Sequence, residues 1–173
     1  GSSVLTSNST DYFTTPYNTS FALNGSTSWT IEGFWNFTSF VNNKAIFDIY
    51  GTTYNFASGT GYQLVIFVSA SGILTINNFN GSGATSTSSS SSLSLNTWYH
   101  LAVTYDGTNV RLFINGVLAA NQAVTIAAQT NLVGVCIGST INVSGAPTGS
   151  SAETFYGNAT NIRVVKGLAV YTS

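Results

Sequence analysis

The segment from residue 96 to residue 120 constrains the fold most, because it predicts three short antiparallel strands in succession. Residues 97–105 alternate, with Trp98 and His100 on the face opposite the leucine and valine side chains. A short loop at Asp106-Gly107 leads into a second alternating run, and Asn115-Gly116 leads into a third. Asn-Gly between apolar runs is the strongest short hairpin signal, because a type I′ turn needs two residues with positive φ. The segment therefore predicts consecutive β-hairpins.

The rest of the chain repeats this pattern of short apolar runs separated by Gly, Asn and Ser. Residues 29–37 alternate between two faces, and Glu32 falls on the face opposite Trp29 and Trp35. Residues 62–68 are nearly all apolar, as in a central strand covered on both faces. The sequence predicts an all-β fold, a two-sheet antiparallel jelly-roll sandwich. Further strands are expected around residues 12–13, 44–50, 73–76, 132–137, 141–143 and 158–165.

Charge is unusually scarce in this sequence. Only 5% of the residues are charged, against about 25% in ordinary soluble domains, and the net charge is −1. No basic patch points to nucleic acid, and no apolar run approaches the roughly 20 residues that membrane insertion requires. The aromatic content of 13% argues against disorder.

The chain of 173 residues fits one domain, residues 1–173. Residues 81–94 are nearly all Ser, Thr, Gly and Ala, so we expect a flexible, exposed loop or an extended edge there. The chain begins at Gly1 and shows no signal peptide, which suggests a processed chain or a part of a longer protein.

Three motifs carry a resemblance to a known family. The pattern Trp98-x-His-x-Ala-Val-x-x-Asp-Gly107 and the segment Trp29-Thr-Ile-Glu-Gly-Phe-Trp35 resemble strands of the laminin-G-like, concanavalin A-like jelly rolls. The end of the chain, from Phe155-Tyr-Gly157 to Thr172, resembles the closing strand of the versions found in phage and other viral structural proteins. We expect the following residues to determine the fold: Trp29, Trp98, His100, Asp106, Gly107, Asn115, Gly116, Gly157 and Arg163.

This fold hosts lectins, glycosidases, adhesion modules and assembly proteins, so the resemblance does not assign a function. Glycoside hydrolysis needs two carboxylates beside one bond, and no acidic residue here has another within ten positions. His100 lies inside the family motif, where a structural role is expected, and Cys136 lies in an apolar run without a neighbouring base. We therefore expect a protein that is not an enzyme.

The resemblance raises calcium as a ligand, since many relatives bind it at the rim of the sandwich through acidic residues of the closing strand. Thr160 and Asn161 occupy those positions here, whereas Ca²⁺ prefers several carboxylates. We expect no cofactor; a weak calcium site built on carbonyl groups and one aspartate, such as Asp106, is the remaining alternative.

Glycan contact is a further candidate, because sugar faces stack on exposed aromatic rings. The three tryptophans fall in strand motifs and are predicted to be core residues, whereas Tyr54, Phe56 and Phe79 are predicted to lie in loops and to contact a glycan or partner. Seven N-glycosylation sequons are present, although a chain this rich in Asn, Ser and Thr contains several by chance. They begin at Asn8, Asn18, Asn24, Asn36, Asn80, Asn142 and Asn158.

The leading hypothesis is a non-enzymatic structural module that self-associates into an extracellular or virion-surface assembly, such as a filament, fibre or shell. A surface almost free of charge avoids both the cost of burying charge at an interface and long-range self-repulsion. The alternative is a carbohydrate-binding or adhesion module of lectin type. The expected partners are therefore other copies of the chain or glycans, with no nucleic acid and no membrane insertion.

Overall fold

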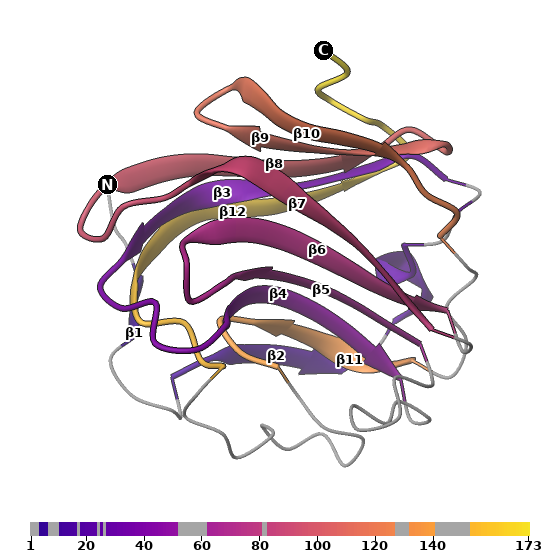
Figure 1. Cartoon of the computed structure of the whole chain (residues 1–173). Helices are drawn as coiled ribbons and strands as arrows, with labels where there is room; N and C mark the ends of the chain where they lie inside the picture. The colour runs from indigo at the N-terminus through magenta and orange to yellow at the C-terminus, as the bar shows by residue number, and fades with distance from the viewer. Residues whose placement is uncertain are drawn as a thin grey trace.

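The protein is a sandwich of two six-stranded antiparallel sheets (Figure 1). The computed structural model describes residues 4–6, 11–16, 18–23, 25, 27–51, 62–80, 83–126, 132–140 and 153–173. The first sheet has the order β1 (Val4–Thr6), β12 (Gly157–Lys166), β3 (Trp29–Phe37), β8 (Trp98–Tyr105), β9 (Asn109–Ile114) and β10 (Val117–Ala123). The second has the order β2 (Phe13–Pro16), β11 (Leu132–Ile137), β4 (Lys44–Gly51), β5 (Tyr62–Val68), β6 (Ile73–Asn80) and β7 (Ala84–Ser92).

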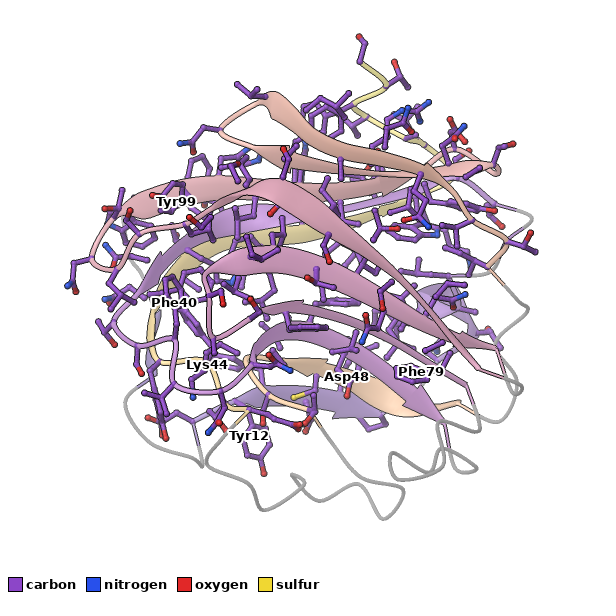
Figure 2. All side chains as sticks on the ribbon, in the orientation of Figure 1. Tyr12, Phe40, Lys44, Asp48, Phe79 and Tyr99 are labelled. Carbon is purple, nitrogen blue, oxygen red and sulfur yellow. The ribbon has the colours of Figure 1, made fainter. Side chains whose placement is uncertain are left out.

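The core lies between the two sheets. Every second side chain of a strand points into it, and the side chains between them point outward. Trp29 and Trp35 of β3 are buried there, and Trp29 lies against Tyr105 of β8 with ring centroids 5.8 Å apart. Phe37 meets Phe155 edge-to-face at 5.0 Å. The predicted all-β sandwich and the predicted faces of β3 are thus confirmed. Figure 2 shows how densely side chains occupy the space between the strands.

Residues Ala84–Ser92 of the serine-rich segment form the edge strand β7. β7 is the last strand of the second sheet, and its residues alternate between exposed and buried at Thr87 and Ser89. The hydroxyl of Thr87 donates to Gln122 Oε1 of β10 at 2.9 Å, which joins the edges of the two sheets. Backbone pairing with β6 and this hydroxyl hydrogen bond together hold β7 in place.

Some sequence predictions are wrong in detail. β6 extends to Asn80, so Phe79 lies in a strand and is only 8% exposed, because it packs with Ala45 and Val65 on the outer side of the second sheet. β1 was not predicted. The strand predicted at residues 141–143 lies outside the described residues.

Three of the chain's few charged residues are buried rather than exposed. Glu32 is 4% exposed, Lys44 is 1% exposed and Asp48 is fully buried; Figure 2 labels the last two on β4. The Lys44 ammonium lies 4.4 Å from the centre of the Tyr156 ring, and burial lowers the pKa of Lys44. The surface is therefore even poorer in charge than the composition indicates. Within the described residues, no helix has the length and apolar character needed to span a membrane.

The two predicted turns close as expected. Asn115 and Gly116 have φ of 52° and 77°, the positive values that a type I′ turn requires. In the loop between β8 and β9, the Asp106 carboxylate accepts hydrogen bonds from the backbone N–H groups of Thr108 and Asn109 at 2.9 and 2.7 Å and pairs with Arg111 at 2.5 Å. Asp106 therefore stabilises this loop, which supports its predicted structural role.

Asp106→Asn is expected to lower the free energy of unfolding at neutral pH by about 1–2 kcal/mol. The backbone hydrogen bond from Asn109 and the side-chain hydrogen bond from Arg111 lower the pKa of Asp106 from 3.8 to about 2. Because the folded pKa is depressed, this stabilisation is present above pH 3.8 and is lost as the pH falls through about 2. Urea unfolding at several pH values checks this: the two proteins should converge in acid, and a constant difference would contradict the assignment.

Candidate functional site

An open pocket lies on the outer face of the first sheet, away from the core. It is lined by one acidic, one basic and three ring-bearing side chains together with an amide: Glu32, Phe34, His100, Asn161, Arg163 and Tyr171. They come from β3, β8, β12 and the segment that follows β12. Segments that are far apart in the sequence therefore meet at one face.

The strand register brings these residues together. Phe34 is paired with His100 across β3 and β8, and Arg163 is paired with Glu32 across β12 and β3. Residues directly opposite each other in antiparallel strands project on the same face with neighbouring Cβ atoms. The β12 register shifts between Thr160 and Arg163, and Asn161 has a φ of 51° at this irregularity. The shift gives an exposed Asn161 at the pocket's border.

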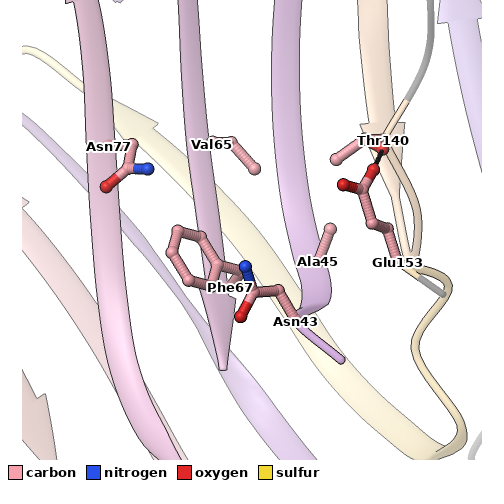
Figure 3. A pocket seen from close by; sticks show the side chains of 7 residues that line it. All are labelled: Asn43, Ala45, Val65, Phe67, Asn77, Thr140 and Glu153. Carbon is pink, nitrogen blue, oxygen red and sulfur yellow. Dashed lines mark hydrogen bonds between the residues drawn. The ribbon is translucent and has the colours of Figure 1, made fainter. Parts of the chain in front are cut away.

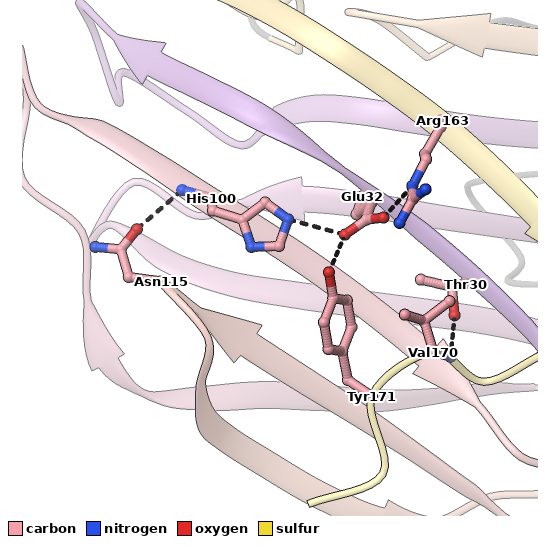
Figure 4. Close-up of polar contacts among 7 residues, drawn as sticks. All are labelled: Thr30, Glu32, His100, Asn115, Arg163, Val170 and Tyr171. Atoms are coloured by element: carbon pink, nitrogen blue, oxygen red, sulfur yellow. Dashed lines mark hydrogen bonds and ion pairs between the residues drawn. The ribbon is translucent and has the colours of Figure 1, made fainter.

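The Glu32 carboxylate is the centre of the polar network in the pocket (Figure 4). It accepts hydrogen bonds from His100 Nε2 at 2.9 Å, from the Tyr171 hydroxyl at 2.7 Å and from Arg163 Nε. Burial raises the pKa of Glu32, but the hydrogen bonds from Tyr171, Arg163 and His100 outweigh it, and the pKa lies below the ordinary value. Glu32 is therefore an ionised acceptor with three donors, which suits a structural anchor better than a general acid.

The segment after β12 crosses the outer face of the first sheet and forms one wall of the pocket. Two buried threonines hold its backbone: the Thr30 hydroxyl donates to the Leu168 carbonyl at 3.0 Å, and the Thr104 hydroxyl donates to the Tyr171 carbonyl at 3.0 Å. The Tyr171 ring also packs against Phe113, with centroids 5.5 Å apart. These contacts fix Tyr171 so that its hydroxyl reaches Glu32.

Exposed aromatic rings lie beside this network. Phe34 is 40% exposed and its ring lies 5.0 Å from the imidazole of His100. Trp98, which pairs with Asn36, is 45% exposed and is the diagonal neighbour of Phe34 on the same face. The face thus combines an apolar platform with the donors of Arg163, whose side chain is 58% exposed. Such a combination can pack against the C–H face of a ligand and hydrogen-bond its polar groups.

One residue predicted to lie in the core is exposed, and one residue predicted to contact a ligand is buried. Trp98 is not in the core, because it lies on the outer face of β8 at the start of the strand. Phe79 is buried on the other sheet, and Tyr54 and Phe56 lie outside the described residues. Phe79, the one described residue of the three, does not line the pocket of the first sheet.

Four other residues predicted to determine the fold make contacts between strands of the first sheet: His100, Arg163, Gly157 and Asn115. His100 and Arg163 hold Glu32, and a side chain at Gly157 would meet the Asn36 carbonyl at 1.9 Å, where β12 begins to pair with β3. The backbone N–H of His100 also donates to Asn115 Oδ1 at 2.9 Å, which ties the β9–β10 turn to β8.

The asparagines of the predicted sequons differ in exposure and in the element that carries them. Asn18 is exposed and accepts a hydrogen bond from the Ser20 N–H at 2.9 Å, at the start of the short 3-10 helix Thr19–Phe21. Asn36 and Asn158 are paired, half-buried residues of β3 and β12. Asn80 ends β6, whereas Asn8, Asn24 and Asn142 lie outside the described residues. Their glycosylation stays a prediction.

Calcium stays an untested alternative. Thr160 and Asn161 lie on β12 beside the pocket, whereas Asp106 lies in the β8–β9 loop and is engaged with that loop's own donors. Within the part of the chain that the structure describes, no group of three His, Cys, Asp or Glu side chains is placed to hold a metal ion.

Sequence reasoning missed Phe34 as a site residue, and it counted Tyr171 only as one of many aromatic rings that could contact a sugar. The signal for Phe34 was available, because a large aromatic residue on the polar face of an alternating strand has no core to enter. Nothing in the sequence distinguished Tyr171 from the other aromatic candidates, because its position depends on where the segment after β12 crosses the sheet.

Comparison with known proteins identifies the family. A laminin G family model, described as the Concanavalin A-like lectin/glucanases superfamily, matches residues 7–166, and no curated protein matches the sequence. The CBM40 of Ruminococcus gnavus IT-sialidase bound to α2,3-sialyllactose has a TM-score of 0.70 at 17% identity, over 95% of this chain and 89% of that one.

Two further solved structures share the fold. The leech intramolecular trans-sialidase has a TM-score of 0.72 at 19% identity, over 98% of this chain and 26% of that one. Domains LG4-5 of the mouse laminin α1 chain have a TM-score of 0.66 at 14% sequence identity. The match covers 94% of this chain and 40% of that one. Identities this low show a common fold and assign no activity. On the match of the family model to nearly the whole sequence, the chain belongs to the concanavalin A-like lectin/glucanase superfamily.

Proposed function

We propose that this protein is a non-catalytic carbohydrate-binding module whose ligand lies on the outer face of the first sheet. The observation that carries the proposal is the exposure of Trp98 and Phe34 as neighbours on one sheet face, next to a pocket lined by Arg163 and Asn161. Adjacent exposed apolar side chains with polar groups at their border are typical of interaction sites, and Trp98 and Phe34 are diagonal neighbours on this face.

The chemistry of this face suits a saccharide. A sugar ring presents an apolar C–H face, which packs on the aromatic rings, and hydroxyl groups, which pair with the Arg163 guanidinium and the Asn161 amide. The Ruminococcus gnavus module of the same fold is bound to sialyllactose, which supports a glycan as the ligand class. Glu32 already accepts hydrogen bonds from three side chains of the protein, so the role proposed for it is to hold Arg163 and Tyr171 in place.

A glycan array followed by calorimetric titration of the best ligand tests the proposal. Trp98→Ala is expected to weaken binding at least about tenfold, which corresponds to roughly 1.4 kcal/mol, because the stacking surface is removed. Phe13→Ala is the matched control: Phe13 lies on β2 of the other sheet and is 53% exposed, so its loss should leave the affinity unchanged. An array without ligands, or equal weakening by both variants, would argue against this binding face.

A second function, self-association into an extracellular or virion-surface assembly, is supported by the charge distribution. Glu32, Lys44 and Asp48 are buried, and Asp106 is paired with Arg111, so few charges are left to oppose association of copies. The edge strand β7 contains no charged residue to prevent pairing with another strand.

Light scattering of the purified protein over a range of concentrations tests self-association. The expected result is a mass that rises with protein concentration and changes little between low salt and about 1 M salt, because few contacts are ionic. A monomer at every concentration would rule this second function out and leave glycan binding.

A further inference from the structure

Three exposed side chains form an oblique row across the outer face of the first sheet: Trp98 on β8, Phe34 on β3 and Arg163 on β12. Trp98 lies opposite Asn36, two residues after Phe34, and Arg163 lies opposite Glu32, two residues before Phe34. The oblique row therefore moves by one strand and two residues at each step, with Phe34 as its middle member.

The oblique row is longer than a single sugar ring. Diagonal neighbours on one face of a sheet are about 7–8 Å apart, so the backbones at Trp98 and Arg163 are separated by about 15 Å. The hydrogen bond from Arg163 Nε to Glu32 holds the guanidinium at its own end of the row (Figure 4). One pyranose ring therefore cannot contact both ends of the row, whereas consecutive units of a saccharide chain can.

No described strand closes either end of the oblique row. Trp98 is the first residue of β8, so the row reaches the end of that strand there. At the other end, β1 pairs with β12 only from Gly157 to Ala159, and no described strand lies beyond Arg163. A chain that follows the row can therefore continue in both directions.

Polar groups border the oblique row on both sides. Asn36 is half-buried opposite Trp98, and the exposed Asn161 lines the pocket beside Arg163. Tyr171 lies on the other side of the row, where the segment after β12 crosses the sheet. Rings can pack on the C–H faces of sugars, and amides can pair with their hydroxyl groups, so the surroundings suit a saccharide along the whole row.

The pocket on the outer face of the second sheet differs from the oblique row (Figure 3). Among the described residues that line it, Phe67 is the one with an aromatic ring, and this ring is half-buried. Ala45 and Val65 beside it are buried. That face therefore offers a control surface for experiments on the first sheet.

We propose that the first sheet binds an extended saccharide chain through at least three consecutive units, which lie obliquely across β8, β3 and β12. The middle unit packs on Phe34, one neighbour packs on Trp98, and the other pairs with the guanidinium of Arg163 in the pocket. Because the ends of the row are open, an interior stretch of a polysaccharide fits as well as a short oligomer. The inference rests on the proposed glycan-binding function and adds the length and the direction of the ligand.

Calorimetric titration with oligomers of one to six units of cellulose, chitin, laminarin and maltodextrin tests the proposal. In at least one series, the affinity is expected to rise at least about tenfold from the monomer to the trimer, because linked units engage successive contacts. From the trimer to the hexamer it should change less than about threefold, since the row offers three contacts and does not block a longer chain.

Trp98→Ala is expected to weaken trimer binding at least about tenfold and dimer binding less than about threefold, because a dimer keeps Phe34 and the pocket. Phe34→Ala should weaken both oligomers, since it removes the middle contact. Asn77→Ala is the control on the second sheet, where Asn77 lines the other pocket, and it should leave every affinity unchanged. Thermal unfolding verifies that the three variants are folded.

A monomer that binds as tightly as its trimer would overturn the inference but keep the proposed function, because the pocket would then hold a single sugar. Equal weakening of dimer and trimer by Trp98→Ala would do the same. If the glycan array retains ligands but none of the four series binds, the extended chain is wrong and glycan binding stands. If neither the array nor the series yields a ligand, the inference and the proposed function fail together.

Discussion

Glu32→Ala is expected to lower the free energy of unfolding by about 2–4 kcal/mol. The change removes the acceptor of three hydrogen bonds and leaves the partly buried His100 and Tyr171 without their common partner. The cost stays below that of a fully buried ion pair because Arg163 is 58% exposed and water can solvate its guanidinium. Urea unfolding followed by circular dichroism measures the difference.

Glu32→Gln is the matched control for this prediction, because it keeps the size of the side chain and one acceptor oxygen. Its destabilisation is expected to be smaller than that of Glu32→Ala. Hydrogen exchange should also show faster exchange in residues 167–173 of Glu32→Ala, since Tyr171 loses its anchor. A loss of less than about 1 kcal/mol with unchanged exchange would mean that the network contributes little.

The pH dependence of the same network has a defined sign. The pKa of Glu32 is lowered in the folded protein below its ordinary value of 4.5, so the stabilisation is present above that pH and is lost as the pH falls through the folded pKa. The difference in stability between the wild-type protein and Glu32→Ala should therefore shrink in acid.

Trp29→Ala is expected to destabilise the protein by about 3–5 kcal/mol, whereas Trp98→Ala should change its stability by less than about 1 kcal/mol. Trp29 is fully buried between the sheets and packs on Tyr105, so its removal leaves a large cavity. Trp98 is 45% exposed and contributes little to the core. Denaturant unfolding of both variants, beside the binding measurement for Trp98→Ala, separates a residue that supports the fold from one proposed to bind ligand. Similar losses of stability would contradict this division.

These two tryptophans also show where sequence reasoning reached its limit. Both lie in family motifs on strands, and both were expected in the core, but alternation assigns a face only relative to its neighbours. Trp29 shares a face with Ile31 and Trp35, whereas Trp98 shares one with His100, so the alternation itself favoured opposite environments. Giving the pattern more weight than aromatic character would have placed Trp98 at the surface.

Local sequence patterns were enough to predict the all-β class, the hairpin at Asn115-Gly116 and the loop at Asp106, whereas for the serine-rich segment they left a loop and an edge strand as alternatives. These features depend on residues close together in the chain: alternation with a period of two, turns that require positive φ, and side chains that bond their own loop. The pocket of the first sheet, by contrast, could not be read from local patterns. Glu32 meets partners that are 68, 131 and 139 residues away in the sequence. Such contacts follow from the order and register of strands in the sheets, which local periodicity does not specify.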